Sequence, residues 1–195
     1  MIICDRQING IRYAIWQLTE NVSELKALID GRFLVSLDNI NNETRQKERL
    51  ASRLLIETLC NGYQAVDYKE NGEPYFSTST LQLSISHTKS YVAVAVAPFR
   101  IGIDIEHTSD RVLRITEKFL NTTELAQLAS HTNQASTALL YWCAKEALYK
   151  KLTKKEPEFT LFTCEQQKNL LHVHYQKEKY TFTFEQNNNY TLVLG

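Results

Sequence analysis

The order of local patterns along the chain limits its fold more than any other feature of the sequence. A long helical pattern at 43–60 comes before runs of strand-forming residues, at 64–68, 74–76, 81–86 and 91–97. The second half repeats this order, with short strand-like runs after helical patterns at 112–120, 122–130 and 135–152. Helices and strands that are separated in this way are typical of α+β proteins. We therefore expect two similar α/β halves, 1–99 and 100–195, in a pseudo-two-fold arrangement.

Turn signals support this division into strands. Asn71-Gly72 is the strongest short-range hairpin signal in the chain, and it lies between the strand-like runs 64–68 and 74–76. A further strand is expected near the start, at 11–18, where IRYAIWQL is rich in apolar and aromatic residues. The chain thus contains enough strands for a small antiparallel sheet in each half.

Composition excludes several classes of protein. The 22 basic and 22 acidic residues give a formal net charge of zero, which argues against the broad basic surface of a general nucleic-acid-binding protein. The four cysteines are widely spaced and form no CxxC pair, which suits a reducing compartment. The chain shows no signal-peptide pattern and no apolar run of about 20 residues. We expect a cytoplasmic protein that binds neither nucleic acid nor a membrane.

Two carboxylates interrupt the apolar run RIGIDIEHT at 100–108. On a strand, Asp104 and Glu106 point to the same side, and Ile103 and Ile105 point to the other. Gly102 permits the close approach of a ligand or of another backbone segment. Two carboxylates on one rigid face suit Mg²⁺, whose remaining ligands are usually water and phosphate oxygens. The alternative is the solvated outer face of an edge strand.

A third carboxylate lies in the helical pattern YWCAKEALYKK at 141–151. Trp142, Glu146 and Lys150 follow one another at four-residue spacing, so they share one stripe of the helix. A carboxylate beside a lysine on a rigid helix could complete a metal site and assist proton transfer. The same spacing also fits an ordinary surface salt bridge, and the pattern alone does not separate these two interpretations.

Two basic or polar groups in the first half are candidates for binding anions. Ser86 and His87 lie where a strand ends and a turn begins, a place where polar side chains meet ligands. Arg45, Arg49 and Arg53 form a four-residue-spaced basic stripe that could bind phosphates. A solvated turn and a solvated helix face are the alternatives.

The histidines of a late strand are weaker candidates. His172 and His174 alternate along the segment LLHVHYQ, and their spacing would allow both to reach one metal ion. No third ligand is evident nearby in the sequence. A solvated strand face is the favoured interpretation.

The order and spacing of these motifs resemble one known family. SISH, GIDIE, FLNTTE and WCAKEALYK occur in the order seen in the 4′-phosphopantetheinyl transferases, specifically the larger pseudo-dimeric type that includes the surfactin-synthetase activator. Two family motifs match in full, at residues 102–106 and 142–150. The motifs together cover about residues 84–150.

The resemblance implies a reaction and a metal site. The family moves the 4′-phosphopantetheine arm of coenzyme A to a serine of an apo acyl or peptidyl carrier protein and releases 3′,5′-ADP. The matching positions imply that Asp104, Glu106 and Glu146 bind Mg²⁺, and that Glu146 helps to deprotonate the serine. Lys150 would balance charge on the transferred phosphate or the leaving group, so Glu146, Lys150 and Asp104 are the expected catalytic residues.

The resemblance also assigns contacts to coenzyme A, which acts as a co-substrate. Ser86 and His87 match the family's coenzyme A contacts, and Lys145 would lie near the same phosphates or the carrier. Arg45 and Arg49 would serve the 3′-phosphate. The N-terminal half, 1–99, would thus hold coenzyme A, and the C-terminal half, 100–195, would carry the metal site and the catalytic helix. Two halves in one chain imply a monomer.

One position departs from the family pattern. Family members commonly have Gly-Lys-Pro where this chain has Gly72-Glu73-Pro74, and a carboxylate cannot replace a lysine beside a phosphate. This contact is therefore lost, reversed or supplied from elsewhere, and Lys69 or Lys89 could compensate. Two alternatives to the transferase stay open: a catalytically degenerate homologue that binds coenzyme A or a carrier protein, and another Mg²⁺-dependent phosphate-ester hydrolase.

Overall fold

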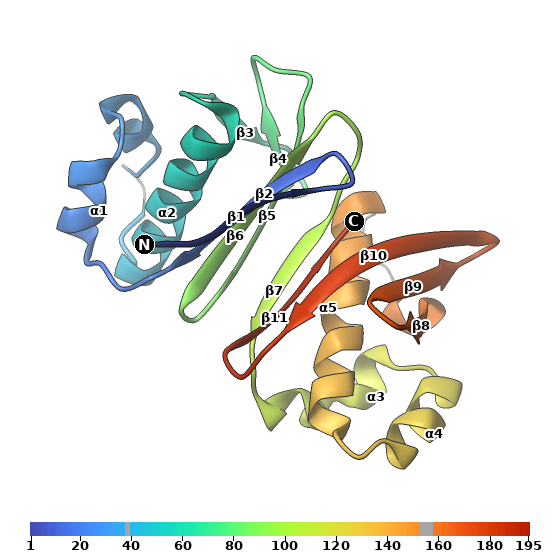
Figure 1. The fold of residues 1–195 in the computed structure, drawn as a ribbon. Coiled ribbons are helices and arrows are strands. Elements are labelled where there is room, and N and C mark those ends of the chain that lie inside the picture. The colour runs from blue at the N-terminus through green and yellow to red at the C-terminus, as the bar shows by residue number, and fades with distance from the viewer. Residues whose placement is uncertain (38–39, 153–157) are drawn as a thin grey trace. The chain divides into compact units, whose positions relative to one another are not determined.

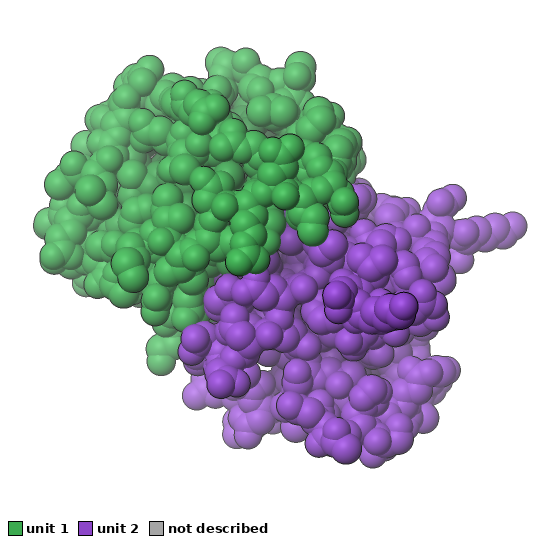
Figure 2. Space-filling view, viewed as in Figure 1, with its two compact units in different colours: residues 1–101 green, residues 102–195 purple. Residues whose placement is uncertain are grey.

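The protein consists of two compact units, residues 1–101 and residues 102–195. The computed structural model describes residues 1–37, 40–152 and 158–195, and Figure 2 colours the two units. Each unit has an antiparallel sheet, its own helices and its own hydrophobic core. The fold is therefore mixed α and β, as the order of sequence patterns predicts.

Unit 1 is built on a four-stranded sheet with the order β1-β2-β6-β5 (Figure 1). Its strands are β1 (Ile2–Ile8), β2 (Ile11–Gln17), β5 (Gln82–Thr88) and β6 (Tyr91–Ala97). A separate hairpin joins β3 (Val66–Tyr68) to β4 (Pro74–Phe76). The helices are α1 (Val22–Leu28), the 3-10 helix η1 (Gly31–Leu37) and α2 (Glu43–Cys60).

The helix α2 packs against the two central strands, β2 and β6. Its leucines at 50, 54, 55 and 59 are buried in the core of unit 1. Asn42 caps its first turn by accepting a hydrogen bond from the Arg45 backbone N–H, and Asn61 ends it in the left-handed conformation. The first turn of α2 is thereby held in place, with Arg45 at its surface.

Unit 2 is built on a five-stranded sheet with the order β7-β11-β10-β9-β8. Its strands are β7 (Ile103–His107), β8 (Thr163–Gln167), β9 (Leu170–Tyr175), β10 (Glu178–Gln186) and β11 (Tyr190–Leu194). Its helices are η2 (Asp110–Ile115), α3 (Thr116–Phe119), α4 (Thr122–Ser130), α5 (Gln134–Leu152) and η3 (Phe159–Leu161). The long helix α5 packs along this sheet and contacts all five strands.

The strand β1 and the segment 112–120 are two places where the structure differs from the sequence prediction. The edge strand β1 is not predicted, because nearly all its side chains are exposed and therefore carry no apolar alternation. The helix predicted at 112–120 is wrong as a single element. Ile115 leaves helical geometry, with φ −126° and ψ 8°, and divides the segment into η2 and α3. In the part of the chain that the structure describes, no helix combines the length and apolar character needed to cross a membrane.

Candidate active site

The two acids of GIDIE lie on β7, which is an edge strand of the sheet of unit 2. Ile103 and Ile105 are completely buried, as predicted, and Asp104 is 3% exposed. Glu106 is only partly buried. The acids do not form the solvated face of an edge strand, because α5 packs against this strand.

Gly102 explains how α5 comes so close to β7. A Cβ atom at this position would overlap the backbone carbonyl of Ala147 on α5, so no other residue fits without moving the helix. The close neighbour is therefore a backbone segment, one of the two options that the sequence left open. This contact lies one residue from Glu146, so it brings the helix stripe next to the acids of β7.

The stripe of α5 contacts both acids of the strand. Lys150 Nζ donates hydrogen bonds to Asp104 Oδ1 at 2.8 Å and to the Ile103 carbonyl oxygen at 3.1 Å. Trp142 Nε1 donates to Glu106 Oε1 at 3.3 Å. The predicted stripe therefore faces β7, and the Glu146–Lys150 spacing is not merely that of a solvated surface pair.

Glu146 lies between these two contacts on the helix. Its pKa is raised to about 7, first by burial and then by the negative charge of Asp104, with a smaller contribution from Glu106. The Lys150 ammonium acts in the opposite direction. A carboxylate with a pKa near neutrality can accept a proton and release it again at physiological pH, which suits a general base.

The donor set also fits a hard metal ion. Asp104, Glu106 and Glu146 are carboxylates on adjacent rigid elements, and carboxylate oxygens are the protein ligands that Mg²⁺ prefers. Repulsion between these carboxylates raises the Glu146 pKa, and a divalent cation would relieve that repulsion. As the side chains lie in residues 1–37, 40–152 and 158–195, no group of three or more His, Cys, Asp or Glu side chains is arranged to hold a metal ion, so these three acids fit Mg²⁺ by their chemistry and not by a preformed geometry.

Lys145 lies away from these acids, in contrast to its expected place near phosphates or a carrier. Its side chain is completely buried, and Nζ is 2.6 Å from Glu124 Oε2 on α4. It also donates to the carbonyl oxygens of Phe119 and Phe159, at 2.7 and 3.2 Å. Its amine is therefore a structural link between α5 and the segments around it, and we do not assign it to ligand binding.

Glu124, which the sequence analysis did not single out, completes this buried network. It accepts hydrogen bonds from the backbone N–H groups of Asn121 and Cys164, at 3.0 and 2.8 Å. The Asn121 side chain in turn caps α4, which makes a capping box. The Asn-x-x-Glu spacing before a helix was the available signal for this residue, although it indicates a helix start and not a lysine partner.

Three of the five anion-binding candidates of unit 1 line a pocket of about 490 Å³, and Ser86 and Arg53 do not. Arg45, Arg49 and His87 all line it, together with Ser52 and Tyr68. The Arg49 guanidinium lies over the Tyr68 ring, 4.5 Å from its centre. The pocket thus combines positive charge with an aromatic wall, and its volume is in the range of small-molecule sites.

Two of the candidates in unit 1 are more buried than a solvated position would be. Ser86 is on β5 and only 5% exposed. Arg53 is 2% exposed and donates to the Tyr68 hydroxyl at 3.3 Å. Burial lowers the pKa of the Arg53 guanidinium. The arginine stripe is therefore not uniform: Arg45 and Arg49 line the pocket, and Arg53 supports its wall from behind.

Glu73, the departure from the family pattern, forms ion pairs within unit 1. Its Oε1 lies 3.0 Å from Lys69 Nζ and 3.7 Å from Arg100 Nη1. These three residues together carry a net charge of +1, so the charge of the Glu73 carboxylate is balanced by its two partners. Glu73 thus gives no independent support to a degenerate homologue.

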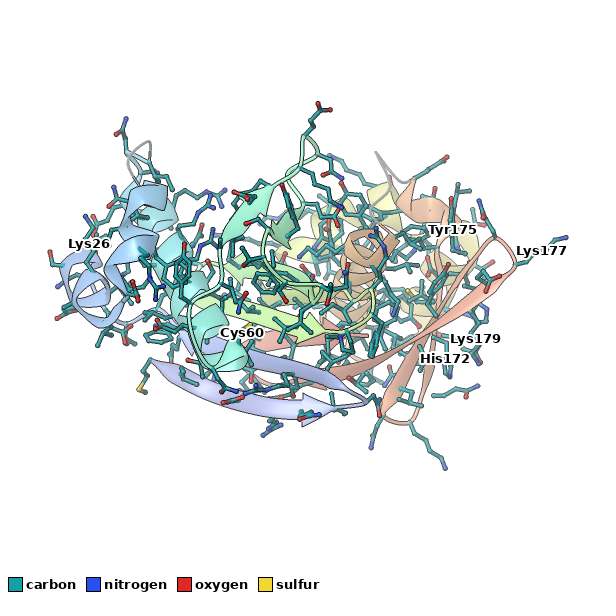
Figure 3. All side chains as sticks on the ribbon, turned by 90° about the horizontal axis from the view of Figure 1, so that it is seen from above. Lys26, Cys60, His172, Tyr175, Lys177 and Lys179 are labelled. Carbon is teal, nitrogen blue, oxygen red and sulfur yellow. The ribbon has the colours of Figure 1, made fainter. Side chains whose placement is uncertain are left out.

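The late histidines lie on β9 and also have partners. His172, labelled in Figure 3, is within hydrogen-bond distance of the Thr181 hydroxyl at 3.0 Å. His174 Nε2 is 3.3 Å from Glu165 Oε2. His172 is buried, so the favoured solvated strand face is wrong for that residue.

Comparison with known proteins points to one superfamily. The model of the 4′-phosphopantetheinyl transferase superfamily matches residues 100–194. A 4′-phosphopantetheinyl transferase gsp of Aneurinibacillus migulanus is 28% identical over 143 residues, which is 70% of this chain and 58% of that protein. A 4′-phosphopantetheinyl transferase of Bacillus subtilis is 32% identical over 89 residues, which is 44% of this chain and 40% of that protein.

These matches confirm the family resemblance seen in the motifs. The superfamily match begins beside β7 and ends at β11, so it contains the two acids and the whole of α5. The alignments cover about half the length of the relatives, at 58% and 40%.

Proposed function

We propose that this chain, in which residues 100–194 match the model of the 4′-phosphopantetheinyl transferase superfamily, transfers the 4′-phosphopantetheine arm of coenzyme A to a carrier protein. The acceptor is a serine hydroxyl of an apo acyl or peptidyl carrier protein, and the other product is 3′,5′-ADP. The observation that carries the proposal is the group formed by Asp104, Glu106, Glu146 and Lys150. In this group a carboxylate with a pKa of about 7 lies among two further acids and an ammonium.

The reaction is a phosphoryl-centred displacement. The serine Oγ attacks the phosphorus that bears pantetheine and forms a new P–O bond. The bond from this phosphorus to the bridging oxygen of the pyrophosphate breaks, and 3′,5′-ADP leaves with the electron pair. A serine hydroxyl is a weak nucleophile, so a base must take its proton.

Glu146 is suited to take that proton. Without a bound metal, burial and the neighbouring acids raise the pKa of its carboxylate to about 7. A bound Mg²⁺ would lower this pKa and keep the carboxylate ionised, so that it could accept the proton directly or through a water molecule. Lys150 places an ammonium beside Asp104, where it balances negative charge on the phosphate that is transferred. Trp142, at the other end of the stripe, orients the Glu106 carboxylate by donating a hydrogen bond to it.

A metal ion belongs to the proposal as the cofactor. Asp104, Glu106 and Glu146 would hold Mg²⁺, which would neutralise charge on the pyrophosphate. The pocket of unit 1 would hold the phosphorylated nucleotide of coenzyme A, with Arg45, Arg49 and His87 as the charged contacts. Ser86 does not line this pocket, because neighbouring residues of β5 point to opposite faces of the sheet, so the contact expected of it would lie outside the pocket.

The remaining expectations also stand as proposals. They are a division at residues 1–99 and 100–195, a pseudo-two-fold relation between the two halves, and a monomer in the cytoplasm. The monomer follows from two halves that supply the coenzyme contacts and the metal ligands within one chain. These points are separable from the reaction itself, which depends on the residues of β7 and α5.

The direct test is the mass of the carrier. We would incubate the protein with coenzyme A, Mg²⁺ and an apo acyl or peptidyl carrier protein, and record the carrier's intact mass. A gain of one phosphopantetheine group, with 3′,5′-ADP as co-product, is the expected result. No gain across several carriers would contradict the transferase, and release of 3′,5′-ADP without any carrier would indicate a hydrolase instead.

A variant pair makes the test specific to the acid group. Glu146→Gln keeps the size of the side chain and removes its ability to take a proton, so transfer should fall by about 10²- to 10⁴-fold. Glu165→Gln removes the same charge from β8 and is the matched control, since Glu165 is exposed. Equal activity of both variants would show that Glu146 is not the base.

A further inference from the structure

A buried carboxylate lies among the positive charges of the pocket in unit 1. Glu48 is on α2 and lines the pocket, and its side chain is 10% exposed. A carboxylate next to a bound phosphate is unfavourable, because like charges repel at short range. A pocket that only gathered positive charge would therefore not contain it.

Glu48 joins the two flanking cations into one cluster. Its Oε2 accepts a hydrogen bond from Arg45 Nη1 at 2.9 Å, and its Oε1 lies 3.4 Å from His87 Nδ1. Arg45 Nη1 is also 3.1 Å from His87 Nε2. Arg45 and Glu48 are three residues apart on α2, which places them on one face of the helix.

The hydrogen-bonding roles in this cluster follow from chemistry. A guanidinium has donors only, so His87 Nε2 must accept from Arg45 when the two are in contact. The proton of the neutral imidazole is then on Nδ1, the nitrogen that faces the Glu48 carboxylate. Glu48 thus sets which nitrogen of His87 is protonated and also holds the Arg45 guanidinium.

We infer that Glu48 is a positioning residue for phosphate binding, which acts through Arg45 and His87 without touching the ligand. This inference rests on the proposed function, in which the pocket holds a phosphate of coenzyme A. When the phosphate arrives, Arg45 Nη1 and His87 Nε2 both donate to its oxygens. His87 takes a proton from solvent at Nε2, and the carboxylate behind it balances the imidazolium.

The charges around the pocket favour this arrangement. Arg45, Glu48 and Arg49 come from α2, His87 comes from β5, and Tyr68 from β3 is the remaining titratable group among the lining residues that the structure describes. Glu48 approaches the ring from the Nδ1 side, and Arg45 approaches it from the Nε2 side. The phosphate therefore replaces the contact between Arg45 and Nε2, and the Glu48 contacts persist.

The test uses the sign of the effect on coenzyme A affinity. Removing a negative charge near a phosphate strengthens binding if only long-range electrostatics matter, and weakens it if the carboxylate positions the cations. We expect Glu48→Gln to raise the Kd for coenzyme A, measured by calorimetry, by about tenfold, the effect of one charge-assisted contact. The KM for coenzyme A should rise in parallel, with kcat unchanged.

The matched control is Glu43→Gln. This change removes the same charge from the first turn of the same helix, at an exposed position that does not line the pocket. It should leave the Kd unchanged or slightly lower. Affinity of Glu48→Gln equal to or tighter than that of the unmodified protein would overturn the inference.

Two further measurements separate the possible failures. If the unmodified protein bound no coenzyme A, the proposed function would fail before the role of Glu48 was tested. The ¹⁵N chemical shifts of His87 in the ligand-free, unmodified protein need neither a variant nor coenzyme A. The Nδ1-protonated form is expected, and an Nε2-protonated form would overturn the inference by itself.

Discussion

Two lysines five residues apart on α5 have opposite environments. Lys145 and Glu124 are both completely buried and 2.6 Å apart. Lys150 and Asp104 are 2.8 Å apart, but Lys150 is 25% exposed and further acids lie beside it. The helix α5 therefore carries two kinds of ion pair. Lys145–Glu124 is fully buried, and we call it the closed pair; Lys150–Asp104 is partly exposed, and we call it the open pair.

The difference between the two pairs lies in what surrounds them. Each polar atom of the Lys145–Glu124 pair has backbone partners, so the pair neutralises itself and holds segments of unit 2 together. The Lys150–Asp104 pair lies among Glu106 and Glu146, where negative charge exceeds positive charge. An excess of carboxylates is costly for stability and useful for binding a cation, so we propose that the Lys150–Asp104 pair serves the chemistry and the Lys145–Glu124 pair serves the fold.

Breaking the closed pair should have the largest effect on stability. Lys145→Met leaves Glu124 as a buried carboxylate without its counter-ion, which should lower the free energy of unfolding by about 3–5 kcal/mol. Denaturant unfolding followed by circular dichroism measures this loss. The double variant Lys145→Met with Glu124→Leu should recover part of it, and a single variant as stable as the unmodified protein would show that the pair is not structural.

The group of acids around the open pair should make the free energy of unfolding depend on pH. The folded-state pKa of Glu146 is about 7 and its reference value is 4.5. The folded state therefore holds the proton to higher pH than the unfolded state. The contribution of the protonated Glu146 to the free energy of unfolding is fully present below about pH 4.5 and is lost as pH rises to about 7.

The substitution Glu146→Gln removes this pH-dependent fall in the free energy of unfolding. Without added metal, the variant should match the unmodified protein near pH 4.5 and become more stable above pH 7, by up to about 3 kcal/mol. Urea unfolding across this range, in the presence of a chelator, gives the comparison. A constant difference between the two proteins at every pH would contradict the raised pKa.

Breaking the open pair should affect activity more than stability. Lys150→Met leaves the buried Asp104 carboxylate without its lysine partner, so the unfolding free energy should fall by about 1–3 kcal/mol, less than for Lys145→Met because Lys150 is 25% exposed. Transfer to the carrier should fall by about 100-fold, because charge on the phosphate loses its balance. Parallel measurements of unfolding and of kcat separate the two effects, and a large stability loss with normal kcat would reverse the roles of the two lysines.

The smallest effect is expected at Glu73. Its ion pairs with Lys69 and Arg100 are at the surface of unit 1, so Glu73→Gln should change stability by only about 0.5 kcal/mol. The released positive charges should lower the Kd for coenzyme A slightly. Calorimetry at low and high salt measures the change, and weaker binding at low salt would show that the carboxylate itself supports the ligand.

Local patterns predicted most elements of the fold. The bounds of α2, β6 and α4 agree with the predicted ranges 43–60, 91–97 and 122–130, because each has caps or an unbroken apolar run. The stripe of Trp142, Glu146 and Lys150 was also visible, since four-residue spacing on a helix fixes a shared face. The edge strand β1 was missed because exposure removes the alternation on which strand prediction depends.

The candidate site was harder to predict wherever partners come from distant segments. Lys145 is next to Glu146 in sequence, but one step along a helix turns the side chain by about 100°, so it points to α4 and not to β7. Glu48 was missed as a member of the pocket, because its partner His87 is 39 positions later. Nothing local to either residue reports such a contact.

The amino-acid sequence thus determined most of the elements, the resemblance to the superfamily and the four residues of the acid–lysine group. Its periodicity, caps and motifs are local, and local physical chemistry is sufficient to specify them. Only the tertiary structure decided that Gly102 lets α5 lie against β7. It also decided that Lys145 is fully buried whereas Lys150 is partly exposed. The contacts of Glu48 with Arg45 and His87 likewise depend on the tertiary structure. Burial and charge balance depend on which segments meet, and that is a property of the packed chain.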